Sequence, residues 1–297
     1  MGDNKLRRSG LYIPGSNPAM MFNAALYGAD TIALDLEDSI AVNEKDATRI
    51  LVRNALRRID FENTEITVRI NALTTPFAVE DLETIIPCAP AGIRLPKAES
   101  AEYVQKADQL IGEIEEKNNL PRGSTKLMLL IETANGIYNL EEIAEASSRT
   151  VSLEFGAEDY ATDLRAKRTL NPSEFTYARE KIVVVARKIG IQALDTVYSD
   201  INNDEGLTEE SVYVMNMGYD GKFAIHPRQV GIINKVFTPS DREIEHALRV
   251  LEAIEEANRR QAGVVSLNGK MIDAPVEIRA RKVIEMAQAA GVKLETR

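Results

Sequence analysis

The sequence has almost none of the residues that form disulfides or bind transition metals. Among its 297 residues there are one cysteine, Cys88, and two histidines, His226 and His246. A single cysteine cannot form a disulfide within the chain, and these three side chains cannot complete the nitrogen and sulfur ligand set of a structural zinc site. A metal ion in this protein would therefore be bound by carboxylates, which favours a hard cation.

Long apolar segments and an excess of basic residues are also missing. The longest apolar runs, such as 127–131 and 182–186, are far too short to span a membrane, and the first ten residues lack the apolar core of a signal peptide. The 36 lysines and arginines against 46 aspartates and glutamates give a formal net charge of −10, which argues against sequence-independent nucleic-acid binding. We therefore expect a cytoplasmic protein that binds neither nucleic acid nor membrane.

Short apolar runs alternate with amphipathic stretches along residues 1–237. We expect a helix after each of eight strands, which the pattern places at residues 10–14, 31–36, 66–70, 92–96, 126–131, 151–155, 193–198 and 222–226. This order and size predict a (β/α)₈ TIM barrel as the catalytic domain. The alternative is an open doubly wound sheet, but the turn at residues 14–18 has no glycine-rich dinucleotide fingerprint.

Residues 238–297 form a C-terminal extension to the predicted barrel. The pattern predicts a charged helix over 241–260, a hairpin over 264–273 with Asn268-Gly269 at its turn, and a last helix over 274–290. No linker or low-complexity tract separates this segment from the barrel, so we expect the two to pack together.

Charged residues gather where the predicted strands end, which is where barrel enzymes place their active sites. Carboxylates brought this close raise one another's pKa unless a cation compensates their charge. Glu132 and Asp159 follow adjacent strands, and together with water and substrate oxygens they suit Mg²⁺. The alternative is that Glu132 caps a helix and Asp159 pairs with an arginine. Further charges at strand ends are Asp35, Glu37, Asp38, Arg69 and Lys97.

Two basic residues at these strand ends each allow two interpretations. Arg69 can hold a substrate carboxylate or carbonyl through two hydrogen bonds, or it can form a structural ion pair, for example with Glu37. Lys97 can form a Schiff base with a carbonyl substrate or make a salt bridge, and we favour the salt bridge.

An ordered set of short motifs along the whole chain resembles the HpcH/HpaI aldolase–citrate lyase family of acyl-CoA carbon–carbon lyases. This family includes citrate lyase β subunits, malyl-CoA lyases and citramalyl-CoA lyases. The motifs are Arg8-Ser9, Pro14-Gly15, Asp35-Leu36-Glu37-Asp38, Val68-Arg69-Ile70-Asn71, Leu95-Pro96-Lys97, Ile131-Glu132-Thr133 and Gly156 with Asp159. Residues 198–203 and 263–273 are most similar to the citrate lyase β branch.

The resemblance implies a site and a set of partners. Mg²⁺ would bind Glu132 and Asp159, and Arg69 and Glu132 would contact the substrate. Asp273 would act as an acid/base group on the active site of a neighbouring subunit, with residues 238–297 as lid and inter-subunit contact. We expect Asp35, Glu37 and Asp38 to support this site. The implied partners are the acyl-carrier (γ) and transferase (α) subunits of citrate lyase, beside a homo-oligomer, either a trimer or a hexamer.

The resemblance also implies a reaction, the cleavage of a citryl thioester to oxaloacetate and an acetyl thioester. Cleavage of citramalyl-CoA or malyl-CoA is the nearest alternative. A Schiff-base aldolase that uses Lys97, or a non-catalytic subunit that only docks carrier protein, are the other two hypotheses.

Overall fold

The computed structural model describes residues 5–167, 173–259, 265–267 and 270–293. The chain forms two compact units, residues 1–234 and 235–297, and each is described here by itself. The sequence pattern put the boundary after residue 237, where helix α10 (Pro227–Phe237) ends. None of the helices in these described ranges is long and apolar enough to cross a membrane.

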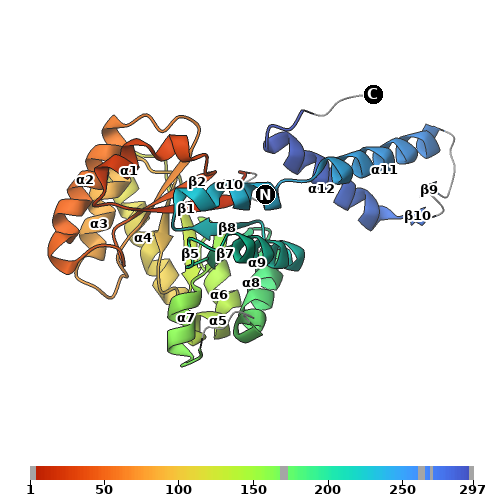
Figure 1. Ribbon diagram of the computed structural model, residues 1–297. Helices are drawn as coiled ribbons and strands as arrows, with labels where there is room; N and C mark the ends of the chain where they lie inside the picture. The colour runs from red at the N-terminus through yellow and green to blue at the C-terminus, as the bar shows by residue number, and fades with distance from the viewer. Residues whose placement is uncertain (1–4, 168–172, 260–264, 268–269, 294–297) are drawn as a thin grey trace. The chain divides into compact units, whose positions relative to one another are not determined.

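The first unit is a closed barrel of eight parallel strands in sequential order, which confirms the predicted (β/α)₈ fold (Figure 1). The barrel closes where Ser9 pairs with Lys222. Near-continuous apolar runs suit these strands because helices cover the outer face of the sheet. The strands are β1 (Ser9–Pro14), β2 (Thr31–Asp35), β3 (Glu65–Arg69), β4 (Gly92–Leu95), β5 (Lys126–Ile131), β6 (Thr150–Phe155), β7 (Gln192–Val197) and β8 (Gly221–Ala224).

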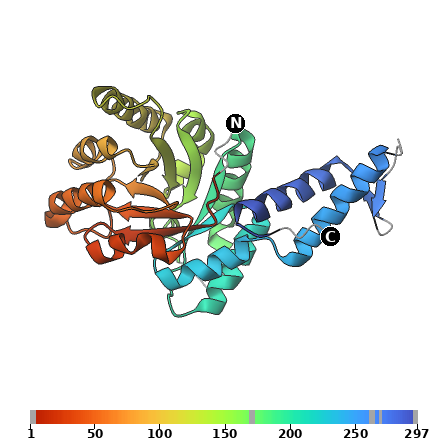
Figure 2. The same ribbon diagram turned by 90° about the horizontal axis from the view of Figure 1, so that it is seen from above.

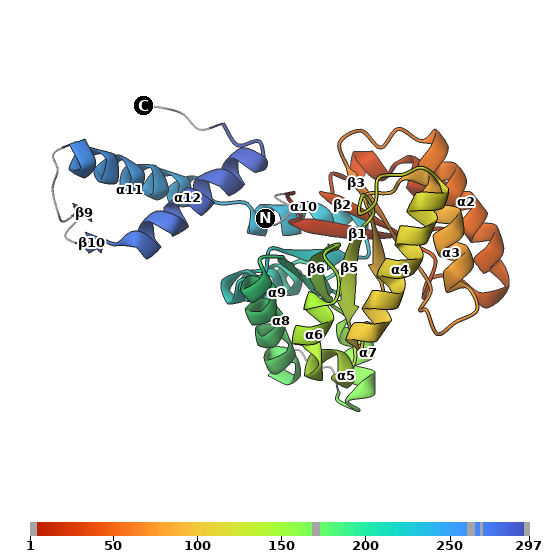
Figure 3. The ribbon, with the colours of Figure 1, turned by 180° about the vertical axis from the view of Figure 1, so that it is seen from behind.

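Helices surround the barrel, as Figure 2 shows from above, and Figure 3 shows α2, α3 and α4 side by side on its outside. Side-chain caps begin several of them, such as Ser100 at α4 and Asn203 at α9. The helices are α1 (Pro18–Phe22), α2 (Lys45–Arg58), α3 (Ala78–Ile85), α4 (Ala101–Lys117), α5 (Ala134–Tyr138), α6 (Leu140–Glu145), α7 (Ala157–Asp163), α8 (Thr176–Ile189), α9 (Asp204–Met217) and α10.

Two strands are each followed by two helices, whereas the sequence pattern predicts one helix after each strand. After β5 the helical stretch is divided at Asn139 into α5 and α6. After β6 a short helix, α7, precedes α8. Because α7 begins directly after the strand, it carries acidic residues at the carboxyl end of the barrel.

Charged side chains are also buried where helices α8 and α9 pack against strands β7 and β8. Lys222 Nζ lies 2.7 Å from Asp195 Oδ2 and 2.6 Å from Glu210 Oε1, and Arg179 donates to both carboxylate oxygens of Asp195. A buried charge is costly unless it is paired and hydrogen-bonded, and these groups meet that condition. The contact between these helices and strands therefore contains an ion-pair network as well as apolar side chains.

The second unit is a helix pair with a small hairpin. Helices α11 (Asp241–Arg259) and α12 (Ala274–Ala289) lie side by side, and strands β9 (Val265–Leu267) and β10 (Lys270–Ile272) pair antiparallel (Figure 1). Val250 and Ala280 belong to its buried core. The predicted hairpin turn at residues 268–269 lies outside the described ranges, and the function of this unit as a lid stays a prediction.

Glu115 generates a prediction about acid stability. It is fully buried at the end of α4, where its oxygens lie 2.7 Å from Arg149 Nη2 and 2.8 Å from the backbone nitrogens of Thr125 and Gly123. Burial raises the pKa of Glu115, but these donors outweigh it and lower the pKa to about 2.

We expect Glu115→Gln to lower the free energy of unfolding at pH 7 by about 2–3 kcal/mol. Because the folded-state pKa is depressed, this contribution is complete above the unfolded pKa and is lost as the pH falls toward 2. Urea unfolding between pH 7 and pH 2.5 measures it. The matched control is Glu116→Gln at the exposed neighbouring position, and equal effects of both changes would contradict the prediction.

Candidate active site

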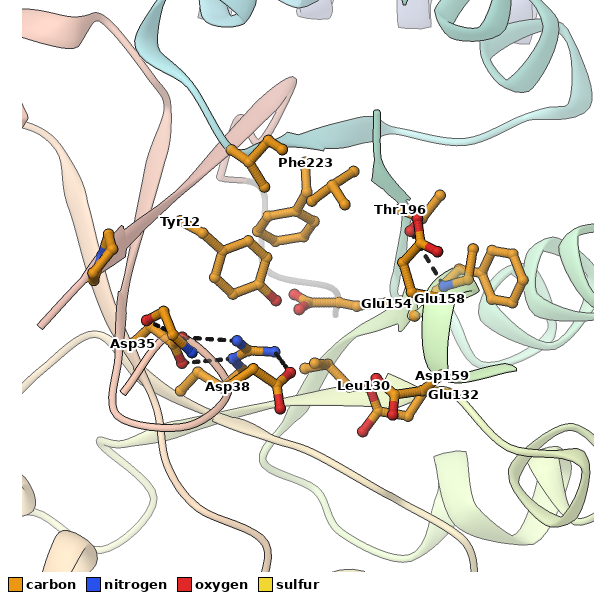
Figure 4. Close-up of a pocket in the computed structure, with 18 residues that line it drawn as sticks. Tyr12, Asp35, Asp38, Leu130, Glu132, Glu154, Glu158, Asp159, Thr196 and Phe223 are labelled. Carbon is orange, nitrogen blue, oxygen red and sulfur yellow. Dashed lines mark hydrogen bonds and ion pairs between the residues drawn. The ribbon is translucent and has the colours of Figure 1, made fainter. Parts of the chain in front are cut away.

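A pocket of about 410 Å³ opens at the carboxyl ends of the barrel strands (Figure 4). Residues from seven of the eight strands and from the loops that follow them line it. The lining residues are Tyr12, Pro14, Asp35, Asp38, Ser39, Arg69, Leu130, Glu132, Glu154, Phe155, Gly156, Ala157, Glu158, Asp159, Thr196, Val197, Phe223 and Ile225.

Arg69 is the last residue of β3 and is held mainly by Asp35, its register partner at the end of β2. Arg69 Nε and Nη2 lie 2.7 and 2.8 Å from the two carboxylate oxygens of Asp35, a bidentate pair. Its Nη1 lies 3.0 Å from Asp38 Oδ2 and 3.1 Å from Glu37 Oε2. The guanidinium also stands over the ring of Tyr12, 4.8 Å from the ring centroid. The orientation of Arg69 is therefore set before any ligand binds.

The carboxylates around Arg69 are in different protonation environments. Burial raises the pKa of Asp35, but Arg69, Ser39 and a backbone N–H outweigh it and bring the pKa below its usual value. Burial raises the pKa of Glu37 to about 8, and the neighbouring carboxylates add to the rise, against the opposing effect of Arg69. Asp35 is thus the permanent counter-ion, whereas Glu37 is largely protonated at neutral pH.

Glu132 and Asp159 lie together on the opposite side of the pocket (Figure 4). Glu132 follows β5 and is 3% exposed, and Asp159 lies in the first turn of α7. Lys97 joins them, because its backbone nitrogen lies 2.7 Å from Glu132 Oε1 and its Nζ lies 2.7 Å from Asp159 Oδ1. The backbone of Lys97 is left-handed, with φ of 54°, a conformation that costs a residue other than glycine about 1–3 kcal/mol.

The electrostatics of this pair favour a bound cation. Burial and the charge of Asp159 raise the pKa of Glu132 to about 7, while Lys97 lowers it. Lys97 Nζ lies 3.7 Å from Glu132 Oε1 as well as 2.7 Å from Asp159 Oδ1. A positive charge can therefore be placed beside both carboxylates at once. Nowhere in the described ranges do three or more His, Cys, Asp or Glu side chains converge as a metal site. Two carboxylates with the remaining positions left to water and substrate suit Mg²⁺.

Gly156 makes room for Glu132. A Cβ atom at this position would lie 2.6 Å from Glu132 Cβ and 2.7 Å from Glu132 Oε2. Gly156 is also the N-cap residue of α7, which places Asp159 next to Glu132. Position 156 therefore requires glycine, because the side chain of Glu132 lies against the backbone there.

The structure brings together most of the residues that the sequence singled out. Five of them line the pocket: Asp35, Asp38, Arg69, Glu132 and Asp159. Two more form ion pairs with these five, since Glu37 contacts Arg69 and Lys97 contacts Asp159. Lys97 makes the salt bridge that we favoured. Burial lowers its pKa, but Glu132 and Asp159 hold the pKa above the usual value, so the neutral amine needed for a Schiff base is scarce.

Asp273 belongs to the second unit. It is the N-cap of α12, where its Oδ1 accepts a hydrogen bond from the Val276 backbone nitrogen at 3.1 Å. A structural function therefore accounts for the residue, and its acid/base function stays a prediction.

Among the pocket residues that the sequence pattern did not indicate are Tyr12, Glu154, Thr196 and Phe223. They lie within strands, whereas the residues predicted to form the site lie where strands end. The available signal was strand alternation, since every second residue of a barrel strand points inward.

A (β/α)₈ barrel whose pocket, at the carboxyl ends of the strands, holds a fixed arginine and two neighbouring carboxylates has the architecture of a barrel enzyme. The model of the family HpcH/HpaI aldolase/citrate lyase matches residues 8–227. The chain belongs to this family, and it is a carbon–carbon lyase.

Several relatives are similar along nearly their whole length. Identity is 42% to citrate lyase subunit beta of Leuconostoc mesenteroides subsp. cremoris, over 97% of this chain and 96% of the relative. Identity is 43% to citrate lyase subunit beta of Escherichia coli (strain K12), over 98% of this chain and 96% of that protein. It is 32% to human mitochondrial citramalyl-CoA lyase, over 97% of this chain and 87% of that protein.

A solved structure of protein CitE from Mycobacterium tuberculosis is also similar. It holds magnesium, acetoacetate and coenzyme A, and it matches with a TM-score of 0.77 and 33% identity over 97% of this chain and 100% of that one.

Gly156→Ala tests the close approach to Glu132. We expect a loss of lyase activity of about 100-fold, because the added methyl group displaces the Glu132 carboxylate by an appreciable fraction of an ångström. The control is Gly231→Ala in α10, where a Cβ meets nothing within 4 Å. Steady-state kinetics and thermal unfolding of both variants provide the measurement, and full activity of Gly156→Ala would show that the position of Glu132 is not critical.

Proposed function

We propose that the protein is the β subunit of a citrate lyase and cleaves a citryl thioester to oxaloacetate and an acetyl thioester, with Mg²⁺ as cofactor. The observation that carries the proposal is the pocket itself, which is lined both by Arg69 and by the Glu132–Asp159 pair. The choice of substrate is supported by identities of 42–44% to citrate lyase β subunits, against 30–33% to citramalyl-CoA and malyl-CoA lyases.

Glu132 and Asp159 would hold the metal ion. When bound, Mg²⁺ supplies a Lewis acid for the oxygen on which charge develops as the carbon–carbon bond breaks. Solved structures of Mycobacterium tuberculosis CitE contain magnesium with pyruvate or with acetoacetate, which supports a metal beside a keto acid in this family.

Arg69 would bind the oxaloacetate half of the substrate. Its bidentate pair with Asp35 keeps the guanidinium plane fixed, so that little side-chain entropy is lost when a substrate carboxylate binds. Glu37, largely protonated at neutral pH because burial raises its pKa to about 8, adds little repulsion toward a polycarboxylate. The acidic pocket can therefore accept an anionic substrate.

Cleavage also needs proton transfer. The tertiary hydroxyl gives its proton to a base as the carbon–carbon bond breaks, and the electron pair of that bond passes to the acetyl thioester as an enolate, which must then be protonated. We assign both transfers to Asp273, supplied by the C-terminal lid of a neighbouring subunit in a homo-oligomer: its carboxylate would take up the hydroxyl proton and return a proton to the enolate carbon. Acyl-carrier (γ) and transferase (α) subunits would present the thioester, and a cytoplasmic location belongs to the same proposal.

A thioester assay tests the reaction and the metal together. We expect citryl-CoA to be cleaved with a higher kcat/KM than citramalyl-CoA or malyl-CoA, and we expect EDTA to abolish and Mg²⁺ to restore cleavage. Glu132→Gln and Asp159→Asn should each lower kcat by at least about 100-fold, since each removes a charged metal ligand. The exposed Glu142→Gln on α6 serves as the control.

Preferred cleavage of citramalyl-CoA or malyl-CoA would reassign the substrate within the family. Unchanged activity of the citrate lyase complex with both carboxylate variants would instead show that the subunit only docks carrier protein.

Asp273 can be tested without disturbing its helix cap. Asparagine caps helices as well as aspartate does, but it cannot transfer a proton. We expect Asp273→Asn to keep the stability of the wild type and to lose about 100-fold or more in kcat, a typical share for general acid–base catalysis. Asp273→Ala should in addition lower stability by about 1 kcal/mol.

If Asp273 acts in trans, mixing the Asp273→Asn and Glu132→Gln proteins should restore activity through hybrid oligomers. No recovery despite demonstrated subunit exchange would contradict action from a neighbouring subunit.

A further inference from the structure

The interior of the pocket contains a carboxylate that the proposed mechanism does not use. Glu154 lies on β6, is 2% exposed and lines the pocket. Its Oε1 is hydrogen-bonded to Arg94 and, at 3.0 Å, to the hydroxyl of Ser152. Its Oε2 is buried and has no hydrogen-bond partner in the described part of the chain. A buried acceptor of this kind normally finds a partner, and here the partner can come only from the pocket side.

Glu154 cannot easily turn its free oxygen away, because Arg94 is itself fixed. Arg94 Nε lies 2.8 Å from Thr67 Oγ1, Arg94 Nη2 lies 3.1 Å from Thr31 Oγ1, and the guanidinium stacks on Phe223 at 4.5 Å from the ring centroid. The pairing also compensates the charge of Glu154, so the carboxylate remains an acceptor inside the barrel. Oε2 is thus a preorganised acceptor.

Tyr12 supplies a second polar group at this place. Figure 4 shows its hydroxyl and the Glu154 carboxylate pointing toward one another in the pocket. No hydrogen bond joins the two, and none holds the Tyr12 hydroxyl to any other residue in the described ranges. Its ring packs on Phe223, with centroids 4.9 Å apart. Burial raises the pKa of Tyr12 above its usual value, so the hydroxyl stays protonated and can donate.

These groups match a substrate alcohol. An O–H group both donates and accepts, so it can donate to Glu154 Oε2 and accept from Tyr12, whereas a substrate carboxylate would be repelled by Glu154. We propose that Glu154 and Tyr12 form an alcohol-binding floor of the pocket and orient the hydroxyl group of the substrate. The inference rests on the proposed function, since each candidate thioester carries a hydroxyl at the bond that breaks. Beside Arg69 on a carboxylate and Mg²⁺ at the Glu132–Asp159 pair, this floor would supply the third contact, and three contacts select one face of the substrate.

The test uses two ligands that differ by one hydroxyl. The first is a thioether analogue of citryl-CoA, in which a methylene replaces the thioester carbonyl so that no enolate can form and no cleavage occurs. The second is the same molecule without the alcohol. Calorimetry at constant Mg²⁺ gives the ratio of the two dissociation constants. We expect the wild type to prefer the alcohol by about 10- to 100-fold, as for a hydrogen bond to a charged group.

Glu154→Gln should reduce this preference to within about threefold, because an amide nitrogen then faces the pocket in place of the acceptor oxygen. Tyr12→Phe keeps the ring packing and should weaken the preference by about two- to tenfold, which keeps the test open if Glu154→Gln does not fold. Ser152→Ala is the matched control. It removes a hydrogen bond from the other oxygen of the same carboxylate, below the pocket, and should leave the preference unchanged.

The outcomes separate the two proposals. Equal binding of both analogues by a wild type that cleaves citryl-CoA would overturn the alcohol-binding floor and leave the proposed function intact. Loss of the preference in Ser152→Ala as large as in Glu154→Gln would likewise overturn it, since the effect would then be structural. A wild type that prefers the alcohol but does not cleave citryl-CoA would overturn the proposed function and keep the floor.

Discussion

The active site depends on the compensation of negative charge at the carboxyl end of the barrel. Asp35, Glu37, Glu132 and Asp159 come from neighbouring strands and loops, and so many carboxylates in a low-dielectric pocket cannot all remain ionised alone. Arg69 compensates one side through Asp35, while Lys97 lies between the pair on the other. The two sides of the pocket therefore differ in their charge compensation, and the side of Glu132 is the one where we propose that Mg²⁺ binds.

The same constraint extends beyond the pocket. Arg94, Arg179 and Lys222 are fully buried, and each is paired with a carboxylate on another strand or helix. Such pairs contribute little net stability compared with apolar packing, but breaking one is costly. Their directional contacts fix rotamers that apolar side chains would leave freer. One consequence reaches the pocket, because Arg94 holds Glu154 in the orientation that leaves Oε2 free.

The barrel could be predicted from the sequence because apolar strands and amphipathic helices alternate with a regular spacing. Residues at strand ends, such as Arg69, Glu132 and Asp159, could also be predicted, since the fold alone brings those ends together. Features that depend on the exact three-dimensional geometry of the site could not be predicted from the sequence. Nothing in the sequence shows that Lys97 adopts a left-handed backbone, or that Gly156 lies against Glu132. Glu154 reads as an interior residue of an apolar strand until its partners are known.

Specificity within this family of reactions is a question of geometry as much as of charge. A metal ion and an arginine can bind any 2-oxo acid fragment, so by themselves they do not distinguish the carbon that bears the alcohol. A third contact from the pocket interior would remove this ambiguity, because three fixed points define one orientation of a prochiral centre. Glu154 is suited to that function because Arg94 anchors one of its oxygens and the other lies on the side of the pocket. The buried Arg94–Glu154 ion pair would then influence the reaction by fixing the position of Glu154 Oε2.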